Sequence, residues 1–136
     1  MTQDIFTIQY PQISVGTEKT DIIFYSSPEL NALMHFLSPN DGLNRIFVTD
    51  PTIIALPALK MLAKEFSISE QALSEGLPQR SVFRKGDNTL VILGAGESFK
   101  TIENVLFIIQ TALESGLQRS SVFVGIGGGV ICDMTA

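Results

Sequence analysis

The sequence contains few of the residues that form disulfides or metal sites. Its 136 residues include one cysteine, Cys132, and one histidine, His35. A single cysteine excludes an internal disulfide and an all-cysteine metal site, and one histidine leaves too few soft ligands for zinc. We therefore expect no metal ligands within this chain.

Long hydrophobic runs and an excess of basic residues are also missing. No segment approaches the ~18 consecutive apolar residues of a membrane span, and the start, MTQDIFTIQ, lacks the basic-then-apolar order of a secretory signal. Nine Lys and Arg residues against fourteen Asp and Glu residues give a net charge of −5. No basic stripe interleaved with aromatics is present. We expect a cytoplasmic protein without a nucleic-acid or membrane partner.

The N-terminal region shows short β-like runs. They cover residues 5–8, 13–15 and 22–25, and Pro11 and a polar stretch interrupt them. These runs predict a β-hairpin. The SSPE sequence that follows supplies a cap, a first-turn proline and an acid, so it predicts a short helix over residues 26–37.

After residue 44, strand-like and helix-like segments alternate. The compact apolar runs at 45–49, 89–93 and 121–126 predict strands buried on both faces. Residues 57–66 and 102–113 carry apolar side chains at helical spacing. In the second segment these are Ile102, Val105, Leu106, Ile109 and Leu113. Because strands and helices alternate, the sequence predicts an α/β fold with a Rossmann-like, mostly parallel sheet, flanking helices and an N-terminal β-hairpin.

Three groups of polar or glycine residues follow the predicted strands. They are Asp50, the AGESFK segment at 95–100, and the three glycines 127–129 with Asp133. The carboxyl ends of parallel strands open onto one edge of the sheet, where ligands bind in such folds. We therefore expect these groups to share one site.

The three glycines remove every Cβ from the turn between a strand and a helix. Backbone N–H groups could then approach a phosphate at the positive end of the helix. GIGGGV does not match G-x-G-x-x-G, because Val130 stands at the last position. A plain tight turn explains the spacing equally well.

Each charged residue of these groups could have either a ligand-binding role or a purely structural role. Glu97 and Lys100 are expected on one face of a helix start, where they could meet ribose hydroxyls and an anion or form a surface pair. Asp50 could hold ribose hydroxyls or cap the next helix. Asp133 could face a ligand or only complement the helix dipole. Cys132 is more simply a structural thiol than a reactive one.

The segments ILGAGESFKTIENV and GLQRSSVFVGIGGGVICDMTA resemble the central signature of the 3-dehydroquinate synthases and related sugar-phosphate cyclases. Members of that family carry G-E-x-x-K before a helix and then a strand ending in G-G-G-V-x-G-D. The resemblance covers residues 45–136. Cys132 stands where the family has glycine, close to the pyrophosphate that the resemblance implies, and Thr52 replaces a residue that assists the ribose-binding acid in many relatives.

The resemblance implies an NAD site and a reaction. It implies a lyase that converts 3-deoxy-D-arabino-heptulosonate 7-phosphate to 3-dehydroquinate and phosphate, in the shikimate pathway of aromatic amino acid biosynthesis. The NAD contacts that it implies are Asp50, Gly96, Glu97, Ser98, Phe99, Lys100, Gly127, Gly128, Gly129, Val130, Ile131, Cys132 and Asp133.

The resemblance also implies that residues 1–136 are the N-terminal NAD-binding domain of a longer two-domain enzyme. In the family, a helical C-terminal domain holds a divalent metal, zinc or cobalt, and the substrate. We therefore expect a truncated chain without catalytic residues that is inactive by itself, and a full-length homodimer.

Two other functions stay open. Glycerol dehydrogenases and iron-dependent alcohol dehydrogenases share the architecture, but their loop has a small hydroxyl residue where this chain has Val130. Deoxy-inosose and valiolone synthases carry similar N-terminal motifs. The second alternative is a non-catalytic nucleotide-binding module.

Overall fold

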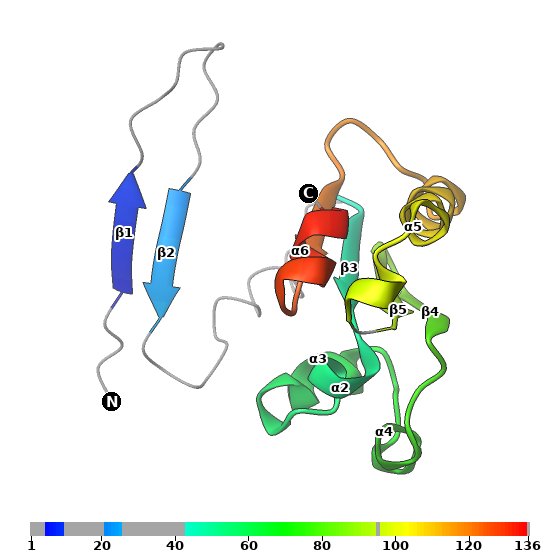
Figure 1. Ribbon diagram of the computed structural model, residues 1–136. Helices are drawn as coiled ribbons and strands as arrows, with labels where there is room; N and C mark the ends of the chain where they lie inside the picture. The colour runs from blue at the N-terminus through cyan, green and yellow to red at the C-terminus, as the bar shows by residue number, and fades with distance from the viewer. Residues whose placement is uncertain (1–4, 10–20, 26–42, 95, 136) are drawn as a thin grey trace. The chain divides into compact units, whose positions relative to one another are not determined.

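The computed structural model describes residues 5–9, 21–25, 43–94 and 96–135 (Figure 1). The chain divides into two compact units, Met1–Leu30 and Asn31–Ala136. The second unit contains every residue of the predicted site.

The first unit contains two paired strands. β1 (Ile5–Gln9) and β2 (Asp21–Tyr25) run antiparallel. This pairing confirms the strands of the predicted N-terminal hairpin. The predicted run at 13–15, the predicted helix at 26–37 and His35 lie outside the described residues.

The second unit is built on a four-stranded sheet with the order β4-β5-β3-β6. Its strands are β3 (Arg45–Thr49), β4 (Arg80–Lys85), β5 (Asn88–Leu93) and β6 (Val122–Gly125). β3 pairs in parallel with both β5 and β6, whereas β4 pairs antiparallel with β5. The predicted Rossmann-like, mostly parallel sheet is confirmed.

Five α-helices and two 3₁₀ turns are described in the second unit. They are α2 (Pro51–Ile54), η1 (Pro57–Leu59), α3 (Lys60–Glu65), α4 (Glu70–Glu75), η2 (Glu97–Phe99), α5 (Ile102–Glu114) and α6 (Gly129–Thr135). The helix predicted over 57–66 is therefore a 3₁₀ turn followed by a short α-helix. The sequence did not predict α2 or α4, since neither is long enough to show a helical period.

The two faces of the sheet carry separate parts of the core. Side chains alternate along β3 and β5, so residues two apart share one face. Phe47, Leu90 and Ile92 pack with apolar residues from α2 to α3. Ile46 and Val48 pack on the other face with residues of α5 and α6. Covering both faces removes the apolar strands from water and leaves the strand ends as the accessible edge.

The longest helix, α5, buries a face that its apolar spacing does not identify. The large apolar residues Ile102, Leu106, Ile109 and Leu113 are 44–73% exposed. The buried positions are Asn104, Ile108, Thr111 and Ala112. The helix itself is confirmed, and so is its glycine end, since Gly116 has φ +87°. Val105 and Phe107 pack against the same core, so the buried face combines polar, small and large apolar side chains.

Candidate functional site

Three chain segments leave the sheet at the carboxyl ends of β3, β5 and β6. Two hydrogen bonds join the first and third segments, because Thr49 Oγ1 donates to the Ile126 carbonyl at 2.7 Å and the Ile126 amide donates to the Val48 carbonyl at 2.8 Å. β5, β3 and β6 are neighbours in the sheet. The predicted convergence of the three groups at one edge is therefore observed.

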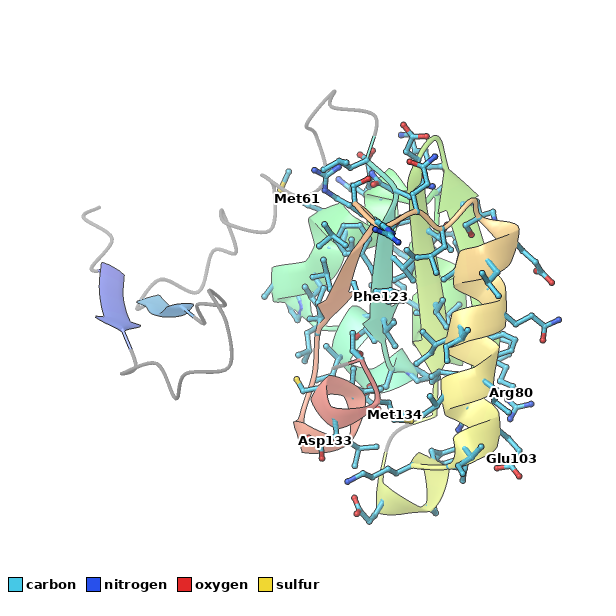
Figure 2. All side chains as sticks on the ribbon, turned by 90° about the horizontal axis from the view of Figure 1, so that it is seen from above. Met61, Arg80, Glu103, Phe123, Asp133 and Met134 are labelled. Atoms are coloured by element: carbon cyan, nitrogen blue, oxygen red, sulfur yellow. The ribbon has the colours of Figure 1, made fainter. Side chains whose placement is uncertain are left out.

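An ion pair joins the second and third segments. Lys100 Nζ lies 3.0 Å from Asp133 Oδ2, and both side chains are partly exposed. The hydrogen bond that Lys100 donates to the Asp133 carboxylate raises the pKa of Lys100 above its usual value, and the negative charges of Asp133 and Glu97 add to this shift. In Figure 2, Asp133 lies on the outer side of α6, whereas Met134 points toward the interior. Lys100 thus reaches a partner 33 positions along the chain.

The turn that carries Glu97 and Lys100 is not the start of a helix. Glu97–Phe99 form a 3₁₀ turn that is preceded by Gly96 with φ +98°. α5 begins only at Ile102, after Thr101, whose side chain accepts from the Asn104 amide. The expectation that Glu97 and Lys100 stand at the start of an α-helix is wrong, because Thr101 supplies the cap and the helix starts later.

The ring of Phe99 fixes this turn on the end of β5. A Cβ placed on Gly94 would lie 2.4–2.7 Å from three atoms of the Phe99 ring, which is closer than any non-bonded carbon contact. The ring therefore occupies the space that a side chain at position 94 would need. Gly94 is required by this close approach.

Asp50 caps a helix, which is one of the two roles that we considered for it from the sequence; the other is binding ribose hydroxyls. Its Oδ1 accepts from the Thr52 amide at 2.9 Å and the Ile53 amide at 2.8 Å. The residue is 6% exposed and has extended backbone angles as the N-cap of α2. Among the described residues, no hydrogen bond reaches its Oδ2, so that oxygen is not used by the cap.

The glycine loop borders open space at two of its three positions. A Cβ on Gly128 or Gly129 would meet no atom within 4 Å, whereas one on Gly127 would lie 3.2 Å from the side chain of Ile131. Gly127 also has φ +156°, at the limit of the region that favours glycine. The loop therefore combines a required glycine with two that leave its surface uncovered.

The predicted contact residues differ in exposure. Gly96, Glu97, Ser98, Lys100, Gly127, Gly128, Gly129, Cys132 and Asp133 are exposed, Phe99 and Val130 are half-buried, and Asp50 and Ile131 are buried. Ile131 belongs to the core beneath α6, so only its backbone could face a ligand. The Cys132 thiol donates to the Gly127 carbonyl at 3.6 Å.

Two residues beside the turn were not among the sequence-based candidates. Asn104 is 4% exposed in the first turn of α5, and Arg80 hydrogen-bonds to it from the start of β4. The only sequence signal is a polar residue three positions after a capping threonine. That signal is weak because most such residues face solvent.

The described part of the chain lacks both a metal-binding cluster and a membrane-spanning helix. It contains no group of three His, Cys, Asp or Glu residues arranged to hold a metal ion. Among the helices described, none is both long and apolar enough to cross a membrane.

Comparison with known proteins identifies relatives. Residues 90–136 match the sequence model of the family described as 3-dehydroquinate synthase N-terminal. The 3-dehydroquinate synthase of Rippkaea orientalis is 48% identical over 44 residues, which are 32% of this chain and 12% of that protein. The chloroplastic 3-dehydroquinate synthase of Solanum lycopersicum is 36% identical over 93 residues, which are 68% of this chain and 18% of that protein.

A third relative, the 3-dehydroquinate synthase of Shewanella halifaxensis, is 49% identical over 47 residues, which are 35% of this chain and 13% of that protein. The chain thus covers only 12–18% of the length of these relatives. The family match contains both the turn at 96–100 and the glycine loop, which are the segments that Lys100 and Asp133 join. Residues 90–136 therefore identify the chain as a relative of the 3-dehydroquinate synthases.

Proposed function

We propose that this chain is the NAD-binding part of a 3-dehydroquinate synthase. The reaction would be the conversion of 3-deoxy-D-arabino-heptulosonate 7-phosphate to 3-dehydroquinate and phosphate, a carbon–oxygen lyase reaction of the shikimate pathway. The observation that carries the proposal is the Lys100–Asp133 ion pair at 3.0 Å. It links the two motifs of the family match at one edge of a parallel sheet, where this fold class binds nucleotides.

The residues at this edge fit NAD in charge and in space. Gly128 and Gly129 leave room for a pyrophosphate to approach the backbone. Lys100 supplies a cation for the same anion. Glu97 and Asp50 Oδ2 are acceptors for ribose hydroxyls. The bound NAD would take up and return a hydride, and the protein would bind and orient it.

The remaining parts of the proposal concern the whole protein. Residues 1–136 would form the N-terminal domain of a two-domain, cytoplasmic, homodimeric enzyme and would be inactive alone. Zinc or cobalt would be held by residues outside this chain. The name of the Solanum lycopersicum relative describes that protein as chloroplastic.

Nucleotide binding is tested by titrating the chain with NAD in an isothermal calorimeter and by NMR, which also detects millimolar affinity. We expect Glu97→Ala and Asp133→Ala to weaken binding about tenfold each, since each removes a charged hydrogen-bond partner. Glu103→Ala is the matched control, because Glu103 is an exposed carboxylate outside the predicted contacts. Equal affinities for all variants would remove the assignment of Glu97 and Asp133.

The reaction is tested on a longer protein that carries this chain, supplied with the heptulosonate phosphate, catalytic NAD and a divalent metal. We expect released phosphate to exceed the added NAD many-fold without accumulation of NADH, because the hydride is returned in each turnover. Stoichiometric NADH from a simple polyol, with no phosphate released, would instead establish the dehydrogenase alternative.

A further inference from the structure

Asn104 is a buried amide whose two ends are both used. It is 4% exposed. Its Nδ2 donates to the Phe99 carbonyl at 2.6 Å, and its Oδ1 accepts from Arg80 Nε at 3.0 Å. The opposite orientation of the amide would set donor against donor and acceptor against acceptor, so the partners determine it. Asn104 therefore connects α5 to both the turn and β4.

Arg80 is held in place from two sides. It pairs with Leu93 in the β4–β5 register, at the end of β5 from which the turn emerges. Its guanidinium lies 5.6 Å from the centroid of the Phe107 ring, three positions after Asn104 on α5. In Figure 2, Arg80 lies beside this helix. A guanidinium stacked on an aromatic ring has fewer orientations, so Arg80 presents Nε to Asn104 in a defined direction.

The bond to Phe99 acts on the residue before Lys100. The Phe99 carbonyl also accepts from the Thr101 amide at 3.0 Å, so two donors fix the peptide group that joins Phe99 to Lys100. We propose that Asn104, oriented by Arg80, is a positioning residue that fixes this peptide and thereby directs Lys100 toward the nucleotide. The part that concerns the nucleotide rests on the proposed function. The part that concerns how Asn104 fixes the turn does not depend on the proposed function.

The test separates the two bonds of Asn104. Asn104→Leu removes both at similar volume, whereas Asn104→Asp keeps an acceptor for Arg80 and loses the donor to Phe99. We expect both variants to speed amide hydrogen exchange at Lys100 and Thr101 and to raise the Kd for NAD about fivefold or more. Thr89→Val is the control, because Thr89 is buried and donates to Ser115 Oγ at 3.0 Å, at the other end of α5.

The outcomes distinguish this inference from the proposed function. Faster exchange and weaker binding in both Asn104 variants, with neither change in Thr89→Val, support the inference. Unchanged exchange at Lys100 and Thr101 overturns it, as does faster exchange with unchanged NAD affinity. If the unmodified chain binds no NAD, the proposed function fails, and the exchange rates alone decide whether Asn104 holds the turn.

Discussion

Gly94→Ala is expected to displace the Phe99 ring and to weaken nucleotide binding at the neighbouring turn. The new methyl group would lie 2.4, 2.5 and 2.7 Å from ring atoms Cδ1, Cε1 and Cγ. Carbon atoms pack at about 3.5–4.0 Å, so the contact must be relieved. Because Cγ is the ring atom nearest the backbone, moving only the ring tip does not relieve it.

We expect Gly94→Ala to cost about 1–3 kcal/mol of unfolding free energy, the usual range for added volume in a packed site. NAD affinity should fall as well, because Lys100 directly follows Phe99. Urea unfolding followed by circular dichroism measures the first effect, and the NAD titration measures the second.

A double-mutant cycle with Phe99→Ala isolates the contact. Removing the ring makes room for the methyl group, so the double variant should be more stable than the sum of the single effects predicts. Strictly additive losses would show that the Gly94–Phe99 contact is not the cause. In that case a different strain at the end of β5 would have to explain the effect of Gly94→Ala.

Phe47→Ala should cause the largest loss of stability, about 3–5 kcal/mol, which is typical for truncating a buried aromatic side chain. Phe47 is fully buried in β3, between β5 and β6. Its ring centroid lies 6.1 Å from that of Phe66 at an interplanar angle of 69°, an edge-to-face contact that adds to the burial. Equilibrium urea unfolding should show a lower midpoint.

Phe47→Leu provides a second measurement if the alanine variant does not fold, and a smaller loss is expected since most of the buried volume is kept. Met61→Ala is the matched control. Met61 is a large apolar residue of α3, but it is 59% exposed, so its truncation should change the unfolding free energy by no more than about 0.5 kcal/mol. Similar losses for Phe47→Ala and Met61→Ala would contradict this assignment of the core.

The accuracy of the sequence-based predictions follows the kind of signal that each element carries. β3 and β5 were predicted because continuous apolar runs are typical of strands buried on both faces. β4 was not predicted, since it is an edge strand whose half-buried RSVFRK sequence lacks such a run. In α5 the spacing identified the helix, but the face that packs on the sheet was set by the fit between the two surfaces.

In the candidate site, too, local sequence signals predicted some features, and the fold decided the others. The glycines at 127–129, the G-E-x-x-K turn and the acid after β3 were recognisable because a turn or a motif is local in sequence. Asp50 was given two roles, and the structure shows the cap, because the Thr52 and Ile53 amides lie within reach of Oδ1. Its ribose contact stays a prediction.

By itself, the sequence determined the α/β class, the three parallel strands and the relation to the 3-dehydroquinate synthases, because apolar period and motif spacing are properties of short segments. The prediction that the third of these strands is buried on both faces was wrong, since β6 ends the described sheet and is only half-buried. The tertiary structure alone decided that Lys100 pairs with Asp133 and that Asn104 bonds to Arg80. These partners are 33 and 24 positions apart. The order of strands in the sheet brings such residues together, and no local pattern encodes which side chains then meet.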